Sequence, residues 1–525
     1  MVREYVGARY VPVFVGEWDS SMQTTYEPLS IVTVANVGSY TSKKFVPVGI
    51  PITDTDYWAL SGSVSGQIIS LTDRVDALEA TIKTPEQFGA VGDGVADDTA
   101  AINSALSGGG IIVFKAGASY KVDPDVSLLV DDNSYVDLNG ATIVSKAVSS
   151  DYYEVFYINQ KSNVTIKNGA IIGDRDIHTG ATGEWGMCVY VGGSSNVLID
   201  NIDISKAWGD GVYIGDTAEY DNVSCSSVTV TNCKIHDCRR QGISVTFADD
   251  VIIDGNIIYN ISGTAPEACI DIEPNSTQHA NNVIISNNIL KVAKKGIETR
   301  DANGDIDHIS IHGNTLEGNN ATGVLMSINN SHASIFDNIF TGDISTNAVS
   351  ILGSDSVFEN NKFIDLVCTI ALYLYDATRI AIKGNTFKKL TLTGSCVYFY
   401  HTSFCSLIGN IFASITTSSS DDYLIYLNGA SGANADYNTI NNNTADNIVF
   451  KYGICFGQYA NHNVMAHNYI RGVYDYTLYT RLGNSIDNNA YFNELYQNAN
   501  NISGGYGGSF VGSLIENIQN GVLVP

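Results

Sequence analysis

Two carboxylate residues lie two positions apart in the segment ACIDIEPN, residues 268–275. Asp271 and Glu273 alternate with Ile270 and Ile272, and this two-residue period is typical of a β-strand with one buried face. Both carboxylates are therefore predicted to point outward on the same face. A pair of carboxyl groups, one protonated and one ionised, is what glycoside hydrolysis requires.

A third carboxylate, Glu298, is predicted to lie beside Asp271 on the next strand. Short phrases such as CVYVG, GISVT, CIDIE and GIETR recur along the chain, and their alignment defines one outward column. Like charges on strands roughly 4.8 Å apart raise one carboxyl pKa, and such strain is concentrated at functional sites. A bound Ca²⁺ is the alternative explanation of this pair, and no other cofactor or metal is predicted. The column is predicted to contain Tyr190, Tyr213, Ser244, Asp271, Glu298 and Leu325.

Other charged and aromatic residues are predicted to surround this centre. Asp210, at the mouth of its strand, is a reserve acid, so the predicted catalytic residues are Asp271, Glu273, Glu298 and Asp210. Aromatic faces stack on the C–H faces of sugars, while arginines and carboxylates bind hydroxyls and acidic substituents. Polysaccharide is therefore the favoured class of substrate. The predicted substrate-binding residues are Tyr190, Tyr213, Trp185, Trp208, Arg239, Arg240, Glu267 and Arg300.

Some of these residues have a second interpretation. Arg240, Glu267 and Lys294 are in register and can form a surface ion-pair ladder worth about 1 kcal/mol. A lyase would need a basic residue beside an acidic sugar, and Arg239 or Arg240 leaves that reaction open.

The stereochemical outcome of a hydrolysis also stays open. The spacing of Asp271 and Glu298 fits a retaining enzyme, whereas that of Asp271 and Glu273 fits the lower end of the range for an inverting one. His178 and His236, in nearby loops, are interpreted as surface histidines and not as bases.

The strands that position these residues belong to a repeat. The phrase VTIKNGAI at residue 164 returns as VLIDNIDI, VTVTNCKI, VIIDGNII, VIISNNIL and ISIHGNTL, and continues at irregular intervals. Two short β-branched strands in each repeat predict an all-β chain folded as a right-handed parallel β-helix. An asparagine recurs in the same register and is predicted to form an internal hydrogen-bonded ladder; its members are Asn256, Asn288, Asn314, Asn338, Asn361, Asn385 and Asn410.

The charge balance excludes some partners. The chain has 28 Lys and Arg against 55 Asp and Glu, and its net charge of −27 over 525 residues repels nucleic acid and anionic membranes. No apolar run approaches the roughly 20 residues of a membrane helix, and MVREYVGARY lacks an apolar signal-peptide core. Neither nucleic-acid binding nor membrane insertion is predicted. The nine scattered cysteines are predicted to be buried thiols.

A segment before the repeats resembles a known family. The run FGAVGDGVADDTAAINSAL, residues 88–106, followed by GGIIVFKAGASYKV, is similar to the start of pectate-lyase-like right-handed β-helices. Asp97 or Asp98 is predicted to cap a short helix over residues 99–106, with Ile102 and Leu106 on one face. Such a helix would cover the open end of the first coil.

The first 66 residues resemble a different family. They contain GEWD at 16–19, SYTSK at 39–43 and YWALSG at 57–62, in the order found in N-terminal modules of tail and appendage proteins from phages of Gram-positive bacteria. The resemblance implies that residues 1–66 attach the chain to a virion through phage tail or collar proteins.

A heptad pattern follows this module. Apolar residues spaced 3, 4, 3 and 4 apart predict a short coiled coil over residues 67–84, which is too short to be stable alone. The seam residues are Ile68, Leu71, Val75, Leu78 and Ile82. Together with the resemblance to tailspikes, the seam predicts a homotrimer. The remaining predicted segments are an N-terminal cap over 85–122, the β-helix over 123–480, and a C-terminal cap or trimer contact over 481–525, where the asparagine ladder is expected to be lost.

Together the resemblances imply a phage tailspike, located on the virion as a tail appendage and acting at the host cell surface. The activity they imply is that of a depolymerase, which binds and degrades host surface polysaccharide. A glycoside hydrolase is favoured over a lyase. Two alternatives stay open: a non-catalytic receptor-binding adhesin, and a hydrolase of teichoic-acid phosphodiesters.

Overall fold

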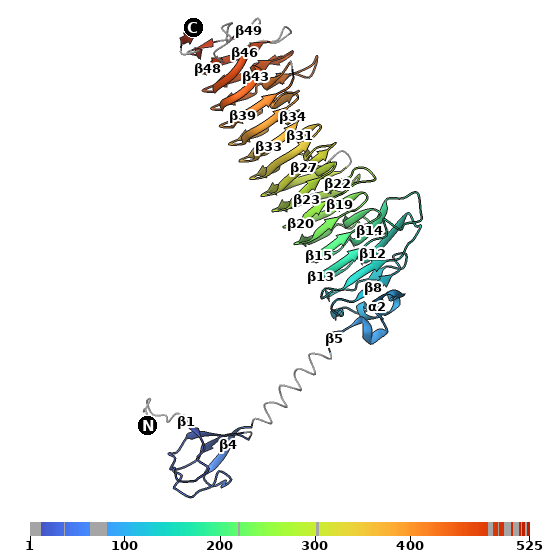
Figure 1. The fold of residues 1–525 in the computed structure, drawn as a ribbon, viewed down its shortest axis with the longest axis vertical. Coiled ribbons are helices and arrows are strands. Elements are labelled where there is room, and N and C mark those ends of the chain that lie inside the picture. The colour runs from blue at the N-terminus through green and yellow to red at the C-terminus, as the bar shows by residue number, and fades with distance from the viewer. Residues whose placement is uncertain are drawn as a thin grey trace. The chain divides into compact units, whose positions relative to one another are not determined.

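The computed structural model describes residues 12–35, 37–63, 81–218, 221–300, 304–419, 421–480, 487–491, 493–497, 506–507, 514–515, 517–519 and 522–524. The chain divides into two compact units, Met1–Ile82 and Lys83–Pro525. Figure 1 traces the strands of each unit along the chain.

The N-terminal unit is built on a four-stranded sheet. β1 and β2 are parallel, whereas β3 is antiparallel to both of its neighbours. The rings of Tyr26 and Trp58 meet edge to face at 5.2 Å and, with Val32 and Val46, form a small separate core. This core accounts for the aromatic-rich composition of the segment. The strands are β1 (Val13–Glu17), β2 (Ser30–Val34), β3 (Gly38–Ser42) and β4 (Trp58–Ser63).

The predicted coiled coil lies mostly outside the described residues. Four of its seam positions, Ile68, Leu71, Val75 and Leu78, are among the residues that the structure does not describe. The fifth, Ile82, lies in the short strand β5 (Ile82–Lys83) and not in a helix. Assembly into a trimer therefore stays a prediction.

The second unit begins with one turn of 3-10 helix, η1 (Pro85–Phe88), and the α-helix α2 (Thr99–Leu106). Helix α2 coincides with the helix that the sequence predicts, and its Ile102 and Leu106 are fully buried. The carboxylate of Asp98 makes no capping bond to the helix but accepts the backbone N–H groups of Val91, at 2.6 Å, and Gly92, at 3.1 Å. Helix α2 lies at the N-terminal end of the stacked strands (Figure 1), and its capping role stays a prediction.

The rest of the unit is a parallel β-helix in which each strand pairs with the equivalent strand of the next coil. One row of strands carries the predicted site and is called the site row here. It consists of β9 (Leu128–Leu129), β12 (Tyr152–Asn159), β14 (Trp185–Gly192), β16 (Asp210–Gly215), β19 (Gln241–Val245), β22 (Ala268–Ile272), β25 (Lys295–Thr299), β28 (Met326–Asn329), β31 (Asn347–Ser354), β34 (Ile370–Thr378), β37 (Val397–Tyr400), β40 (Tyr423–Asn428), β43 (Thr444–Phe456), β46 (Tyr469–Thr480) and β49 (Tyr506–Gly507).

Two further rows complete the coils, and the long strands β13, β15, β43 and β46 extend from one row into another. The second row is β7 (Gly110–Val113), β10 (Ser134–Asp137), β13 (Ser162–Ile172), β15 (Ser195–Ser205), β17 (Cys225–Thr231), β20 (Ala248–Asp254), β23 (His279–Ser286), β26 (Asp305–His312), β29 (Ala333–Phe336), β32 (Val357–Glu359), β35 (Ala381–Lys383), β38 (Ser406–Ile408), β42 (Thr439–Asn441), β45 (Val464–Ala466), β47 (Asn489–Tyr491) and β50 (Leu514–Ile515).

The third row is β6 (Asp93–Asp97), β8 (Ser119–Val122), β11 (Thr142–Ser145), β18 (Lys234–His236), β21 (Ile257–Tyr259), β24 (Ile289–Val292), β27 (Thr315–Ala321), β30 (Ile339–Ile344), β33 (Lys362–Cys368), β36 (Thr386–Leu392), β39 (Ile411–Thr417), β48 (Glu494–Gln497) and β51 (Asn517–Gln519). β52 (Val522–Val524) is antiparallel to β51, and β41 (Ala435–Asp436) pairs with β44 (Ala460–Asn461).

The inward faces of the three rows form one continuous hydrophobic core. Equivalent residues of successive coils stack on each other, as Phe363, Phe387 and Phe412 do with ring centroids 4.5 and 4.8 Å apart. All nine cysteines are free and buried, as the sequence predicts, eight of them in this core and Cys455 in a separate cluster with Tyr423, Tyr426 and Tyr452.

The predicted asparagine ladder is present and fully buried. The side-chain oxygen of Asn338 accepts the backbone N–H of Asn314 at 3.0 Å, and its amide donates to the carbonyl of Ile311 at 2.9 Å and to Asn361 at 3.0 Å. The ladder continues beyond the predicted members through Asn443, Asn468 and Asn493. The expectation that it is lost after residue 481 is therefore wrong.

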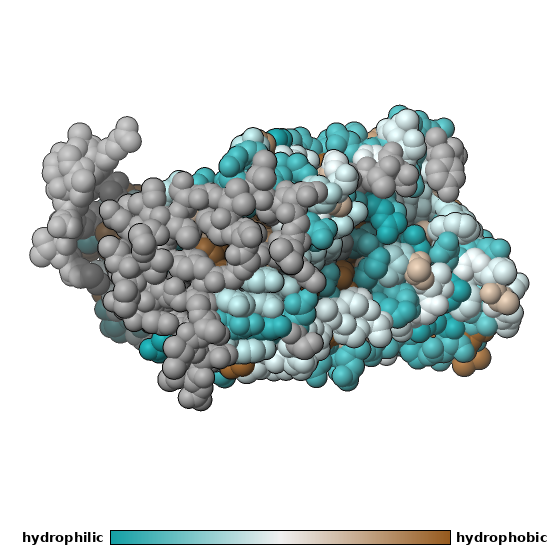
Figure 2. Space-filling view, turned by 90° about the horizontal axis from the view of Figure 1, so that it is seen from above, coloured by the Kyte–Doolittle hydropathy of each residue, from teal (hydrophilic) through white to brown (hydrophobic). Residues whose placement is uncertain are grey.

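The described outer surface is predominantly hydrophilic on the side that Figure 2 shows. In the parts of the chain that the structure covers, no helix is long and apolar enough to cross a membrane.

Candidate functional site

The outward column of the site row is confirmed over most of its length. Register pairs join Tyr190 to Tyr213, Ser244, Asp271 and Glu298 in that order. The last predicted member is wrong, because Glu298 pairs with Ser327 and Leu325 is fully buried in the core. The connection before β28 contains two more residues than the alignment assumed, which moves the register by two.

Asp271 lies at the centre of this column and is 1% exposed. The side-chain amide of Gln241 donates to one of its oxygens, whereas Oδ1 has no hydrogen-bond partner. Burial raises the pKa of Asp271 well above its usual value, with further contributions from the charges of Glu298 and Glu273, and Arg240 opposes the rise. Asp271 is therefore a carboxylic acid that holds its proton at higher pH than an exposed aspartate.

Asp210 occupies a separate buried position one coil before Gln241 and is fully buried. It accepts hydrogen bonds from the hydroxyl of Ser244 at 2.7 Å and from Nη1 of Arg240 at 3.1 Å. Burial raises the pKa of Asp210, and the charge of Arg240 opposes the rise. The guanidinium of Arg240 also donates to Gln241 at 2.6 Å and lies 3.5 Å from the carboxylate of Glu184. Arg240 and Gln241 thus connect Asp210 to Asp271.

The other two predicted catalytic residues are ion-paired. Lys295 Nζ lies 2.6 Å from a carboxylate oxygen of Glu298, and Arg300 lies 3.4 Å from Glu298 and 3.1 Å from Glu273. The side chain of Glu298 is 8% exposed and that of Glu273 27% exposed, so Glu273 is the most accessible carboxylate of the group. We call Asp271, Glu273 and Glu298 the carboxylate row.

The carboxylates of the row point away from the core, as the sequence predicts. Asp271, Glu298 and Asp210 are nevertheless buried by neighbouring side chains. In the described residues no group of three or more His, Cys, Asp or Glu side chains is placed to hold a metal ion.

An open cleft of about 340 Å³ lies beside Arg240 on the same face. Its predicted members are Tyr190, Tyr213, Trp185 and Arg240. Residues that the sequence reasoning missed complete it, from β12, β14 and the connections after β19 and β22. They are Tyr152, Met187, Thr246, Asn275 and Gln278. We call this pocket the aromatic cleft.

Two tyrosine rings of the cleft, Tyr190 and Tyr213, lie against glycines of their own strands, Gly192 and Gly215. The rings of Tyr157, Tyr190 and Tyr213 are stacked with centroids 5.4 and 5.1 Å apart. A Cβ atom on Gly215 would collide with the hydroxyls of Thr246 and Tyr213, so the glycine leaves the space that these side chains occupy. The hydroxyl of Tyr213 lies 2.8 Å from that of Thr246. The sequence shows this arrangement as a Tyr-x-Gly spacing, which occurs at residues 190–192 and 213–215.

Three predicted substrate-binding residues make other contacts. Arg239 lies 3.8 Å above the ring of Trp208 and donates to the carbonyl of Gly183 at 2.7 Å. Glu267 pairs with Lys294 at 2.6 Å, as the ladder interpretation expected, but Arg240 makes its ion pairs with Asp210 and Glu184. Trp208, Arg239 and Glu267 do not line the aromatic cleft, and neither does the fourth such residue, Arg300, which pairs with Glu273 and Glu298.

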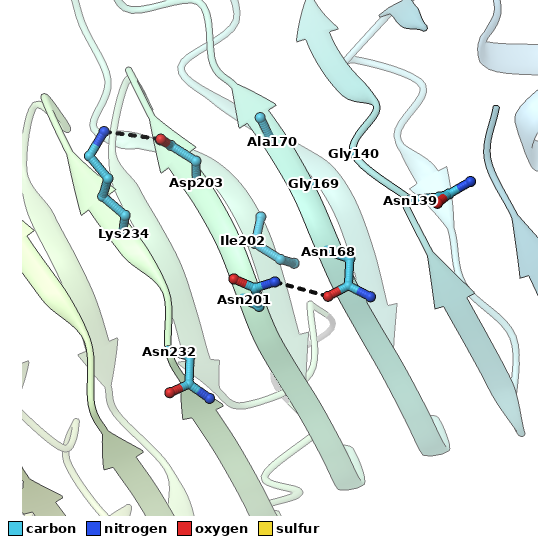
Figure 3. Close-up of a pocket in the computed structure, with 10 residues that line it drawn as sticks. All are labelled: Asn139, Gly140, Asn168, Gly169, Ala170, Asn201, Ile202, Asp203, Asn232 and Lys234. Carbon is cyan, nitrogen blue, oxygen red and sulfur yellow. Dashed lines mark hydrogen bonds and ion pairs between the residues drawn. The ribbon is translucent and has the colours of Figure 1, made fainter. Parts of the chain in front are cut away.

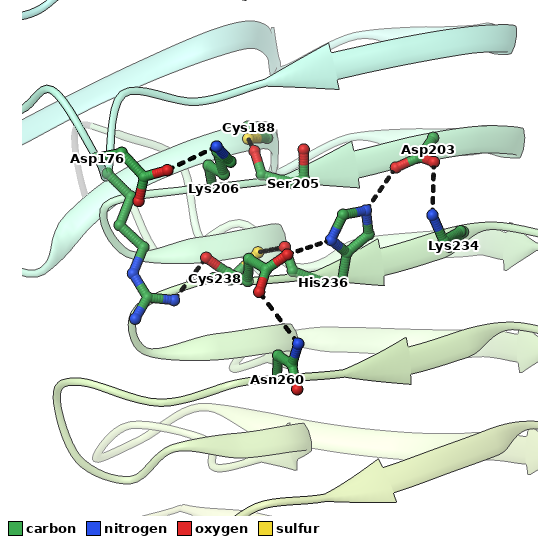
Figure 4. Close-up of polar contacts among 11 residues, drawn as sticks. Asp176, Cys188, Asp203, Ser205, Lys206, Lys234, His236, Cys238 and Asn260 are labelled. Carbon is green, nitrogen blue, oxygen red and sulfur yellow. Dashed lines mark hydrogen bonds and ion pairs between the residues drawn. The ribbon is translucent and has the colours of Figure 1, made fainter.

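The two histidines also have structural contacts. His178 is not at the surface, since its side chain is fully buried, lies 2.7 Å from Asp174 and stacks on Trp208 at 3.9 Å. His236 lies between Asp203 and Asp237, at 2.8 and 2.6 Å, as Figure 4 shows for Asp203.

A larger groove of about 690 Å³ lies elsewhere, at a corner of the coils (Figure 3). Asn168 and Asn201 point toward each other and are hydrogen-bonded at 3.0 Å, and Lys234 pairs with Asp203 at 3.0 Å. The groove has no aromatic wall, and its carboxylate is occupied by Lys234 and His236. The aromatic cleft therefore fits a sugar ligand better.

Comparisons with known proteins agree with this fold. Residues 123–278 match the family model described as right handed beta helix region. The chain is 31% identical over 214 residues to the uncharacterized protein YclG of Bacillus subtilis (strain 168), a match that covers 35% of this chain and 37% of YclG. It is 30% identical over 171 residues to the SPbeta prophage-derived uncharacterized protein YorA of the same organism, covering 30% of this chain and 28% of YorA.

A third relative is an enzyme. The chain is 28% identical over 223 residues to the mannuronan C5-epimerase AlgE1 of Azotobacter vinelandii, covering 38% of this chain and 15% of AlgE1. These matches span 37% or less of each relative's own length. Solved structures of phage tailspike proteins are also similar, with TM-scores of 0.43 or below and identities of 15% or below. The family match confirms that the coils over residues 123–278 form the right-handed β-helix that the sequence predicts.

Proposed function

We propose that the chain is a phage tail protein whose β-helix binds host surface polysaccharide in the aromatic cleft and cleaves it with the carboxylate row. The relative YorA is prophage-derived, which supports a phage origin. The relative AlgE1 is named for mannuronan, a polysaccharide, which supports the class of ligand.

The observation that carries the proposal is the contact between the cleft and the row. Arg240 lines the aromatic cleft and is joined through Gln241 to Asp271. The stacked tyrosines and the polar Asn275 and Gln278 that line the cleft match the two kinds of surface that a sugar ring presents.

The chemistry follows from the different environments of the carboxylates. Asp271 has a raised pKa and is the group that holds a proton to donate to a leaving oxygen. Glu273 is ion-paired with Arg300 and Glu298 with Lys295, and Glu273, the most exposed of the three carboxylates, activates water. Asp210 is bound to Arg240 and Ser244 and serves to orient Arg240.

A binding-only adhesin is the second candidate, and the burial of Asp271 favours it. With Asp271 only 1% exposed and in contact with Gln241, a substrate oxygen reaches the acid only if the side chains that cover it move aside. A protein that binds without cleaving needs no such movement.

Activity on host surface polysaccharide separates the two candidates. Reducing ends, unsaturated sugars and released phosphate are measured for the wild type and for Asp271→Asn and Glu273→Gln, and Glu359→Gln, on the second row, is the matched control. Loss of a general acid or base lowers turnover by about 100-fold or more, so both site variants lose activity and the control keeps it. Full activity in both site variants would contradict the assignment of the row, and binding without any product would establish the adhesin.

A further inference from the structure

The outward column of the site row continues beyond the carboxylates. From Glu298 it passes through Ser327 and Ser350 and then becomes aromatic, at Tyr373 and Tyr398. The same face thus carries tyrosines at both ends, with the carboxylate row and two small serines between them. The strands concerned, from β14 to β34, follow one another along one side of the coils in Figure 1.

Four tyrosines form a compact aromatic surface here. Tyr373 and Tyr375 of β34 lie beside Tyr398 and Tyr400 of β37. The ring centroids of Tyr373 and Tyr398 are 5.3 Å apart, those of Tyr375 and Tyr400 are 5.6 Å apart, and all four residues are half-buried. We call this group the tyrosine platform. A core position would be fully buried, so these rings are partly available to a ligand.

The edge of the platform carries a polar group without a partner. The ring of His401 stacks on Tyr400 at 3.7 Å, and its Nδ1 lies 3.0 Å from a carboxylate oxygen of Asp376. The other ring nitrogen, Nε2, is buried and has no hydrogen-bond partner. A buried polar atom of this kind is satisfied when a hydroxyl-bearing ligand approaches it.

We propose that the tyrosine platform is a second carbohydrate-contact site, on which the polysaccharide chain held in the aromatic cleft also lies. This inference rests on the proposed function. Tyr213 and Tyr373 are separated by six steps between neighbouring coils, through Ser244, Asp271, Glu298, Ser327 and Ser350. Steps of roughly 4.8 Å give a separation of roughly 29 Å.

This separation makes binding depend on ligand length. A short oligosaccharide of two or three sugars reaches only one of the two aromatic surfaces, whereas a polymer contacts both. Ser327 and Ser350 have small side chains and therefore do not obstruct a polysaccharide chain that runs from the aromatic cleft to the tyrosine platform. The phenol hydroxyls and His401 favour a hydrated sugar over a dry contact with a second copy of the chain.

The test uses the full chain and size-graded oligosaccharides released by partial acid hydrolysis of the host's surface polysaccharide. Dissociation constants are measured by calorimetry for Tyr375→Ala and Tyr400→Ala. The matched control is Tyr437→Ala, because Tyr437 is 49% exposed and stacks on Phe404 at 5.1 Å but lies outside the site row.

The platform variants are expected to weaken binding of oligosaccharides longer than roughly 29 Å by about five-fold or more and to leave short ones unchanged. The control changes neither. Suppose that the platform variants bind long oligosaccharides as the wild type does, while Tyr213→Ala weakens binding of short and long ones alike. That result overturns this inference and leaves the proposed function standing. If the platform variants change the oligomeric mass and not the affinity, the platform is a contact between copies of the chain, and the inference is also overturned. Absence of any oligosaccharide binding by the wild type refutes the proposed function itself.

Discussion

Replacement of Asp271 by asparagine is predicted to stabilise the surrounding coils at neutral pH. Burial and the charges of Glu298 and Glu273 raise the pKa of Asp271 well above its usual value. A carboxyl group whose folded-state pKa exceeds its unfolded value of about 3.9 contributes stability below that value and loses it as pH rises through the raised pKa. Each unit of this rise corresponds to about 1.4 kcal/mol.

Asparagine has nearly the same shape and carries no charge. Its side-chain oxygen keeps the hydrogen bond from Gln241, and its amide faces the carboxylate of Glu298 on the next coil. The variant is therefore expected to match the wild type below pH 4 and to exceed it in stability at pH 8.

Hydrogen exchange of the amides of β22 and β25 measures this difference locally, because coils of a solenoid open in separate units. Exchange at pH 4 and pH 8 is corrected for the intrinsic rate, and Glu359→Gln again serves as the control. A gain in protection of equal size at both pH values, or no gain at pH 8, would refute the assignment of Asp271 as a buried group with a raised pKa.

Three further predictions concern the ladder, the cleft and assembly. Asn338→Ala removes the hydrogen-bond partners of the Asn314 backbone N–H and the Ile311 carbonyl. Each group left buried and unpaired destabilises the fold by about 1–3 kcal/mol, so the thermal midpoint should fall. Gly215→Ala should displace the ring of Tyr213 and weaken binding of short oligosaccharides in calorimetry while the circular dichroism spectrum is unchanged. Light scattering should give three times the chain mass, and Leu71→Asp or Leu78→Asp should reduce it; a wild-type monomer at micromolar concentration would contradict the trimer.

The fold was predictable from sequence because its repeats are local. Each coil repeats the same alternation of apolar residues, and a buried asparagine recurs at the same turn, so that a single alignment defines many strand pairs. Register from Tyr190 to Glu298 followed from that alignment. It failed at Leu325 because the length of one connection changed by two residues, and strand periodicity of two gives no warning of an even shift.

Residues contributed by the connections were less accessible to sequence reasoning. Asn275 and Gln278 follow β22 and line the cleft, but no periodic pattern places them there. Trp208 was predicted to bind substrate together with Trp185. The structure places it between His178 and Arg239, and a stack of this kind depends on three separate segments of chain.

Burial of the carboxylate row shows the limit of the period-two argument most clearly. Alternation says that Asp271 points away from the core, and this is correct, but the exposure of an outward residue depends on its neighbours on adjacent coils. Gln241 precedes Asp271 by one coil and donates to it, and Arg240 adds a charge that opposes the rise in pKa. The burial that raises the pKa of Asp271 also keeps solvent from it. A catalytic role therefore requires movement of the side chains that cover Asp271, of which Gln241 is one. In Gln241→Ala, turnover should rise if access to Asp271 limits the reaction, and it should fall if Gln241 is needed to orient Asp271.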